Sequence, residues 1–78
     1  MRVTLYTRPA CGLCRDAEEL LARLRQKIHF DLEIVDIDKN SPAHDEYWER
    51  IPVVTVNGAE VAAGRIDGGQ LRKVLTSG

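Results

Sequence analysis

The sequence has few cysteines, few aromatic residues and almost no net charge. Of its 78 residues two are cysteine, one is tryptophan, two are tyrosine and one is phenylalanine, and 11 basic residues nearly balance 12 acidic ones. The net charge of -1 gives no electrostatic reason to expect binding to nucleic acid or to an anionic membrane. Two cysteines do not make the disulfide framework of a small secreted scaffold, so we expect a cytoplasmic protein.

Long apolar runs are also missing, because no uncharged run approaches the roughly 20 residues of a membrane-spanning helix. A strand pattern starts at Val3, so we expect neither a signal peptide nor a membrane partner. The composition, 44% hydrophobic and 29% charged, is typical of a globular protein. The length fits one domain over residues 1–78, and we expect this domain to be a monomer.

What the sequence does contain is a pair of closely spaced cysteines, Cys11 and Cys14. Before them, Val3 and Leu5 alternate with more polar residues, which predicts a strand over residues 2–6. A Cys-x-x-Cys pair between a strand and a helix is typical of a dithiol–disulfide site. After the pair, apolar residues recur on one face of a predicted helix of roughly 16 residues: Leu13, Ala17, Leu20, Leu21, Leu24 and Ile28.

The middle of the chain predicts a second strand and a short helix. Apolar residues alternate with charged ones from Phe30 to Ile34, so we expect an edge strand that runs parallel to the first. We expect the short helix from residue 41 to about residue 50, packed on the sheet through Tyr47 and Trp48.

A hairpin is predicted next. Pro52 belongs at the first position of a strand over residues 51–56, because proline cannot donate to a ladder. Asn57 and Gly58 both tolerate positive φ, so they predict a two-residue turn that leads into an antiparallel strand over residues 59–63.

The last element is a helix with Leu71, Val74 and Leu75 on one face. Asp67 and Gln70 precede it as in a capping box, so we expect both side chains to satisfy backbone amides at its start. The order β-α-β-α-β-β-α predicts an α/β fold with a four-stranded mixed sheet and helices on both faces.

Three motifs, in this order, resemble those of the glutaredoxins and of small bacterial glutaredoxin-like electron donors. The motifs are Tyr6-Thr7-Arg8-Pro9-Ala10-Cys11-x-x-Cys14, Ile51-Pro52-Val53 and Gly64-x-x-Asp67, and the likeness covers residues 3–75. The resemblance implies the minimal thioredoxin-like fold and the activity of a thiol–disulfide oxidoreductase. Two departures are Gly12-Leu13, where typical dithiol glutaredoxins have Pro-Tyr, and Ala63-Gly64, where they have paired glycines.

The residues themselves predict how the thiols work. Cys11 is expected at or just before the first turn of the helix, where free amides and the positive dipole end favour a thiolate nucleophile. Cys14, one turn further in, is expected to displace the mixed disulfide. Arg8 is a candidate to stabilise the thiolate or to bind a substrate carboxylate.

The resemblance adds substrate-binding residues. It implies that Pro52 follows a cis peptide bond and that this loop of Ile51, Pro52 and Val53 offers unpaired backbone, contributed by Val53, to an extended substrate. It also implies that the turn from Gly64 to Asp67 holds the amino-acid end of glutathione. No bound cofactor is expected, with glutathione as a candidate co-substrate. The expected partners are a disulfide-containing protein or a glutathione mixed disulfide, and a reductase or glutathione.

Two other classes of function stay open at this point. One is a glutathione-dependent carrier of iron–sulfur clusters, in which two subunits share a cluster through Cys11. The other is an interaction domain of the same fold whose thiols are inert. Zinc is not expected in the monomer, because His29 lies roughly 22 Å beyond Cys14 along a helix at ~1.5 Å per residue. Asp36 and Asp38 predict a solvated turn, and we assign no general base.

Overall fold

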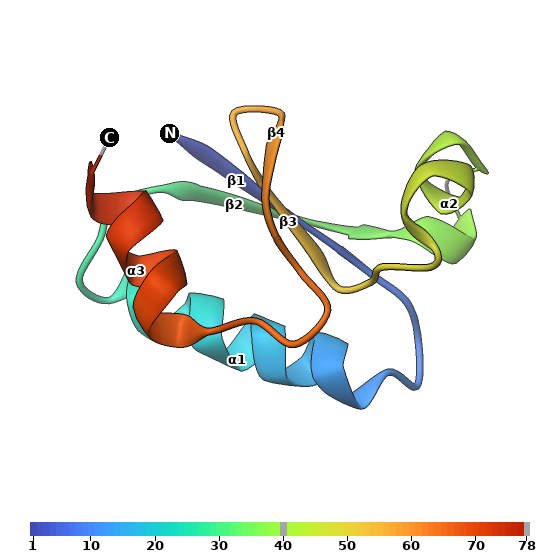
Figure 1. Cartoon of the computed structure of the whole chain (residues 1–78), viewed down its shortest axis with the longest axis horizontal. Coiled ribbons are helices and arrows are strands. Elements are labelled where there is room, and N and C mark those ends of the chain that lie inside the picture. Colours follow the sequence, from blue (N-terminus) through green and yellow to red (C-terminus); the bar gives the residue numbers. More distant parts are fainter. Residues whose placement is uncertain (40, 78) are drawn as a thin grey trace.

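The structure, a computed structural model, describes residues 1–39 and 41–77 and contains one four-stranded sheet (Figure 1). In chain order its elements are β1 (Arg2–Thr7), α1 (Gly12–Arg25), β2 (Asp31–Asp36), the 3-10 helix η1 (Ile37–Lys39), α2 (Ser41–Tyr47), β3 (Val53–Val56), β4 (Ala59–Ala63) and α3 (Gly68–Ser77). With η1 added, this is the predicted order. None of the helices within the described ranges is long and apolar enough to cross a membrane.

The strands lie in the order β2-β1-β3-β4, with β2 parallel to β1 and the other neighbours antiparallel. The predicted mixed sheet and the edge position of β2 are therefore confirmed. Val3 in β1 pairs with Leu32 of β2 on one side and with Val56 of β3 on the other. β1, one of the two central strands, therefore leads directly into the loop that carries the cysteines.

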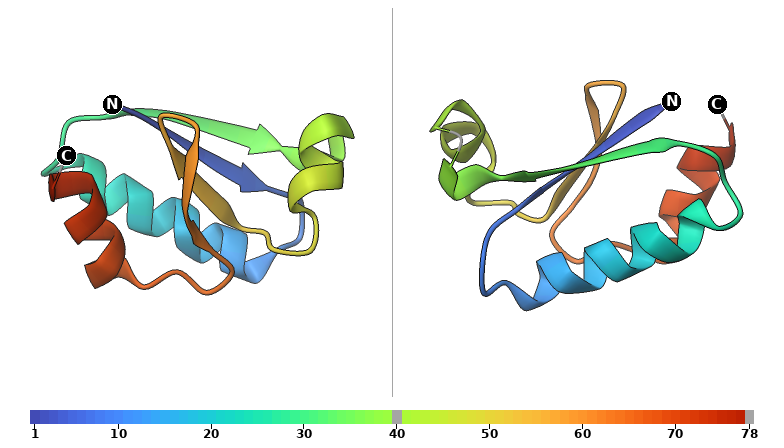
Figure 2. Two further views of the ribbon diagram at one scale, coloured as in Figure 1. Left: turned by 45° about the horizontal axis from the view of Figure 1, so that its top comes forward. Right: turned by 180° about the vertical axis from the view of Figure 1, so that it is seen from behind.

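The core lies between the sheet and the two longer helices. Side chains alternate between the faces of a strand, and Val3 and Leu5 point to the face that α1 and α3 cover (Figure 2). Leu21 of α1 and Leu71 of α3 meet them there, and all four are at most 2% exposed. Burying side chains of this size stabilises the fold by about 1.5–3 kcal/mol each, and this core fixes α1 against the sheet.

The short helix α2 lies at one end of the sheet, on the opposite face (Figure 1). Tyr6 of β1 packs on Tyr47 with ring centroids 4.4 Å apart, as expected for a helix held by an aromatic residue. The Arg50 guanidinium lies 5.6 Å from the centre of the Tyr47 ring. Burial, followed by the neighbouring Glu46 carboxylate, raises the pKa of Tyr47 above its ordinary value of 10.0.

The hairpin between β3 and β4 forms as predicted. Asn57 and Gly58 have φ angles of 51° and 90°, in the left-handed region that a two-residue hairpin turn requires. The Asn57 side-chain oxygen accepts a hydrogen bond from the Arg2 backbone amide at 2.9 Å, and the Asn57 backbone amide donates to the Arg2 carbonyl at 2.8 Å. The turn is therefore fastened to the start of β1.

Three apolar side chains that we expected to pack are exposed instead. Leu13 is 39% exposed, and Ile34 and Trp48 are each 49% exposed. Ile34 lies on the outer edge strand, beyond which no described element covers it. Trp48 follows the end of α2 and stacks on His44, with centroids 6.3 Å apart, rather than on the sheet.

Two helices are shorter than predicted. α1 ends at Arg25. The amides of Gln26 and Lys27 then donate to carbonyls three residues back, at 3.2 and 3.1 Å, in a tighter turn. α2 ends at Tyr47 instead of near residue 50, because the Arg50 amide bonds the Tyr47 carbonyl in a tighter turn. These local hydrogen bonds replace a further helical turn at each end.

Candidate active site

The two cysteines lie at the start of α1. Cys11 is the N-cap residue, with extended backbone angles, and its sulfur accepts a hydrogen bond from the Cys14 amide at 3.2 Å. The two residues form a disulfide and their Cα atoms are 5.2 Å apart. On reduction, a Cys11 thiolate keeps an amide donor and the positive end of the helix dipole beside it. Both cysteines therefore lie where the sequence placed them.

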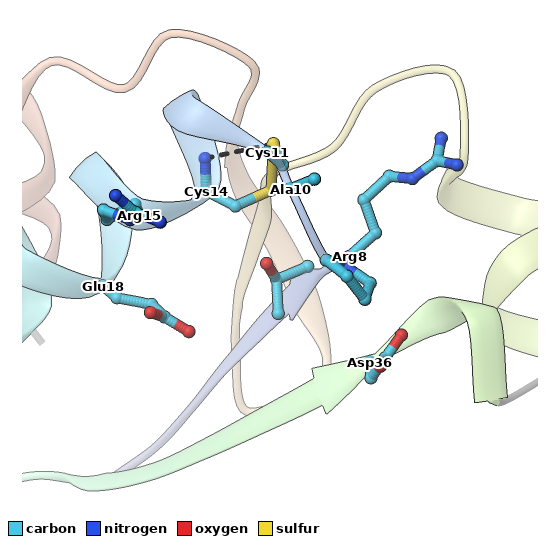
Figure 3. Close-up of a pocket in the computed structure, with 9 residues that line it drawn as sticks. Arg8, Ala10, Cys11, Cys14, Arg15, Glu18 and Asp36 are labelled. Carbon is cyan, nitrogen blue, oxygen red and sulfur yellow. Dashed lines mark hydrogen bonds between the residues drawn. A yellow bond between two sulfur atoms is a disulfide. The ribbon is translucent and has the colours of Figure 1, made fainter.

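The two sulfurs differ in access. Cys14 is 2% exposed, whereas Cys11 is half-buried at the tip of the loop (Figure 3). Ala10, directly before it, has a φ of 57°, a left-handed conformation that residues with a Cβ atom rarely adopt and that is concentrated at functional sites. A disulfide that approaches from solvent meets Cys11 first.

Pro52 follows a cis peptide bond, as the resemblance implied. The antiparallel register pairs Val53 of β3 with Tyr6 of β1, so Pro52 lies beside the end of β1. The loop to Cys11 starts at that end. The fold therefore brings the cis-proline and cysteine loops, about forty residues apart in the sequence, to the same end of the sheet.

The two neighbours of this proline differ in their backbone pairing. Val53 is fully buried and pairs on both sides, with Tyr6 and with Ala63, so it belongs to the sheet ladder. It does not supply the unpaired backbone that we assigned to it. Within the described part of the chain, the backbone of Ile51 has no hydrogen bond and is the segment left free to pair with an extended substrate.

Gly64 holds the next loop against this one. Its amide donates to the carbonyls of Pro52 at 2.8 Å and Arg50 at 3.0 Å. Its φ of 70° lies in the left-handed region that glycine adopts without a steric penalty. The turn that starts at Gly64 is therefore tied directly to the cis-proline loop.

Asp67 caps the last helix. Its Oδ1 accepts hydrogen bonds from the amides of Gly69 at 2.8 Å and Gln70 at 3.2 Å. The capping box is only half formed, because the Gln70 side chain makes no hydrogen bond within the described residues. Asp67, Gln70, Ala63 and Arg65 line a surface pocket of about 200 Å³, so the turn expected to hold glutathione borders an open site.

A second pocket, of about 280 Å³, adjoins both cysteines on the side of α1 and β2 (Figure 3). Its lining residues are Thr7, Arg8, Pro9, Ala10, Cys11, Cys14, Arg15, Glu18 and Asp36. Four of these side chains carry charge, two of each sign. The pocket is a polar space beside a disulfide whose inner sulfur is otherwise buried.

Arg8 and the two aspartates meet at the rim of this pocket. Arg8 Nε lies 3.9 Å from Asp38 Oδ2, and the Asp38 amide donates to Asp36 Oδ1 at 2.9 Å. The turn predicted from the two aspartates is confirmed. Arg8 lines the same pocket as the sulfurs, although its ion pair is directed towards Asp38.

Sequence reasoning missed Glu18 and Arg15 as neighbours of the thiols and read Asp36 only as a turn residue. Glu18 carried a usable signal, since it follows Cys14 by four residues and helical spacing puts both on one face. Asp36 carried no such signal, because its position beside α1 depends on where β2 ends in the folded sheet. Across the described ranges, this pocket included, no three His, Cys, Asp or Glu side chains gather in a group that would hold a metal ion.

Comparisons with known proteins agree with this architecture. The sequence model of the "Glutaredoxin-like domain (DUF836)" family matches residues 2–76. The uncharacterized protein Rv0508 of Mycobacterium tuberculosis is 33% identical over 76 residues, which cover 91% of this chain and 78% of the relative.

Solved structures are also similar. The structural genomics target XcR50 of X. campestris has a TM-score of 0.78 and 32% identity, and 97% of each chain is covered. The glutaredoxin-like protein NrdH-redoxin of Escherichia coli, described with a thioredoxin-like activity profile, has a TM-score of 0.58 and 25% identity over 81% of this chain and 83% of its own. The implied thioredoxin-like fold is thus confirmed, and the cysteine pair fits a redox role.

Proposed function

We propose that this chain, which belongs to the glutaredoxin-like domain family, is a thiol–disulfide oxidoreductase that reduces disulfides through Cys11 and Cys14. The observation that carries the proposal is the placement of Cys11. Its half-buried sulfur caps α1, accepts an amide hydrogen bond and is bonded to the buried sulfur of Cys14. Stabilisation of a thiolate at a helix N-terminus is what the attacking thiol of such an enzyme needs.

The reaction has two exchange steps. The Cys11 thiolate attacks one sulfur of a substrate disulfide, forms a mixed disulfide and expels the other substrate sulfur as a thiolate. Cys14 then loses its proton and attacks the sulfur of Cys11, which releases the second substrate thiolate. Two electrons have moved from the protein to the substrate, and the Cys11–Cys14 disulfide remains for an external reductant to reopen.

Substrates of this chain are a disulfide-containing protein or a glutathione mixed disulfide. An extended peptide would pair with the free backbone of Ile51 beside Pro52, and Arg8 is available for a carboxylate at the rim. The turn from Gly64 to Asp67 would receive glutathione as co-substrate. No prosthetic group takes part, and the protein acts as a cytoplasmic monomer.

The electron source is glutathione or a flavoprotein reductase. The thioredoxin-like activity profile described for NrdH-redoxin supports a reductase, because that protein shares the fold with this chain. The Gly64–Asp67 turn, which the resemblance assigns to glutathione, supports glutathione as the electron source. The two sources are distinguished by supplying each one separately.

The test is a coupled assay with wild type and Cys14→Ser. Each protein receives a glutathione mixed disulfide, glutathione, glutathione reductase and NADPH, and the oxidation of NADPH is followed. Turnover by both proteins is expected if glutathione is the reductant, because Cys11 alone completes that cycle. Thioredoxin reductase with a protein disulfide is offered next, where only the wild type should turn over. Silence of the wild type in both assays would contradict the proposal.

A further inference from the structure

Every reduction by this dithiol requires Cys14 to give up a proton in a buried place. Cys14 is 2% exposed, and burial away from solvent disfavours a thiolate. The helix end and the amide hydrogen bond favour the thiolate at Cys11, not at Cys14. Only the thiolate of Cys14 attacks the mixed disulfide, so the second exchange step needs a proton acceptor near this sulfur.

The pocket of about 280 Å³ supplies a path for that proton. Cys14 lines its wall together with Glu18 and Asp36, and the pocket opens beside the loop of Cys11 (Figure 3). A single water needs only about 10–15 Å³ of such space, so the pocket has room for water between the sulfur and a carboxylate. Transfer through one water is within the reach of a general base.

Of the two carboxylates that line the pocket, Glu18 is the one that makes no other polar interaction within the described residues. It follows Cys14 by four residues in α1, which puts the two Cβ atoms on one face about 5–6 Å apart. Within the described residues its side chain has no ion pair or hydrogen bond, although Arg15 lines the same pocket. Asp36, by contrast, already accepts the Asp38 amide at 2.9 Å and caps a turn.

We propose that Glu18 is the proton acceptor of Cys14, acting across the pocket that the two residues share. This inference rests on the proposed function. The ionised carboxylate takes the proton of the Cys14 thiol, and the resulting thiolate attacks the sulfur of Cys11. The leaving group departs as a thiolate, and the proton passes from Glu18 to solvent. When a reductant reopens the Cys11–Cys14 disulfide, the same carboxyl group returns a proton to the Cys14 sulfur.

The test separates the two exchange steps by their products. Reduced protein is mixed with the aromatic disulfide of 2-nitro-5-thiobenzoate in a stopped-flow spectrometer. Attack by Cys11 releases one coloured thiolate, and attack by Cys14 on the mixed disulfide releases the second. Rates of both phases are measured from pH 5.5 to 9.5 for wild type, Glu18→Gln, Glu18→Asp and the matched control Glu19→Gln, whose residue is exposed and outside the pocket.

Glu18→Gln is expected to slow the second phase about 100-fold or more at pH 7 and to leave the first phase unchanged. Its second phase should speed up as the pH rises and approach the wild-type rate at the alkaline end of the range, since the thiol then ionises without help from the carboxylate. Glu18→Asp should recover part of the loss. Arg8, Arg15 and Asp36 face the same pocket, and their charges are unaltered in these variants, so a difference from Glu19→Gln reports the carboxylate itself.

Asp36→Asn separates the two candidate acceptors. We expect its second phase to stay within about twofold of wild type, because its carboxylate serves the turn. A second phase that is unchanged in Glu18→Gln, or slowed more in Asp36→Asn than in Glu18→Gln, would overturn the assignment of Glu18. A wild type whose first phase is no faster than that of free cysteine would instead contradict the proposed function.

Discussion

The two sides of the Cys11–Cys14 disulfide are surrounded by different chemical groups. On the side of α1 and β2 the surroundings are charged side chains, with Glu18 and Asp36 in a shared pocket. On the side of Pro52 they are backbone groups held in place by strand pairing and by the Gly64 amide. Side chains move protons, whereas a rigid backbone edge recognises an extended chain whatever its sequence. Together, the two proposals assign proton transfer to the pocket side of the disulfide and pairing with the substrate backbone to the other side.

The largest effects on turnover are expected when either sulfur of the disulfide is removed. Cys11→Ser should lower turnover to the uncatalysed rate with every disulfide, because a serine hydroxyl is not ionised in this position. Cys14→Ser should keep the first attack and accumulate a mixed disulfide with a protein substrate, detected as a covalent complex on a non-reducing gel. If Cys14→Ser forms no such complex while the wild type turns over, Cys14 is not the residue that resolves it.

Gly64→Ala is expected to weaken the backbone side and leave the pocket side intact. A Cβ atom at Gly64 meets nothing within 4 Å, but the φ of 70° costs a residue with a side chain roughly 1–2 kcal/mol. The free energy of unfolding in urea should fall by about that amount, and the KM for a protein disulfide should rise. The rate at which Cys11 reacts with a small disulfide should not change.

Gly12→Ala is the matched control for this variant. Gly12 lies in the first turn of α1, where its φ is not positive and an added Cβ atom has open space. Alanine is favoured over glycine in a helix by roughly 0.5–1 kcal/mol, so this variant should gain stability. A loss of stability in Gly12→Ala as large as in Gly64→Ala would show that the strained φ is not the cause.

The sequence predicted the elements well because their signals are local. Alternation gave β1 and β2, helical spacing gave α1 and α3, and Asn57-Gly58 gave the hairpin. The cysteine positions followed from the strand–helix junction alone. The cis bond before Pro52 did not, since local sequence favours trans and only the resemblance to glutaredoxins implied cis.

What the sequence missed depends on contacts between distant segments. The resemblance to glutaredoxins assigned the backbone of Val53 to substrate, but the ladder with Tyr6 and Ala63 occupies it, and the register of that ladder cannot be read from residues 51–56. The pocket that joins Glu18 of α1 to Asp36 of β2 exists only after the crossover brings both elements together. Trp48 was expected to pack, but α2 stopped one residue earlier and left it on the surface.

Asp67 allows the cap and the proposed glutathione site to be tested separately. Asp67→Asn keeps an oxygen that can accept from Gly69 and Gln70, so stability should be nearly unchanged, whereas Asp67→Ala should lose about 1 kcal/mol. Because asparagine keeps the capping oxygen and removes the negative charge, Asp67→Asn tests the loss of charge alone. If the turn holds the ammonium group of glutathione, Asp67→Asn should raise the KM for glutathione several-fold in the coupled assay. An unchanged KM would leave Asp67 with the capping role alone.

The smallest effect is expected far from both sides of the disulfide, at Tyr47. Its pKa is raised in the folded protein by burial and by Glu46, so the folded state keeps the phenolic proton to higher pH than the unfolded state does. The free energy of unfolding should therefore fall as the pH rises from about 10 through the folded pKa. Tyr47→Phe keeps the ring against Tyr6 and removes this titration, so its stability should decline less steeply above pH 10.

The measurement is urea unfolding of both proteins between pH 7 and 11. All other side chains are the same in both proteins, so the quantity of interest is the difference between the two curves at each pH. That difference should be constant below about pH 9 and should move in favour of Tyr47→Phe above pH 10. Parallel curves over the whole range would show that the phenol titrates alike in the folded and unfolded chains.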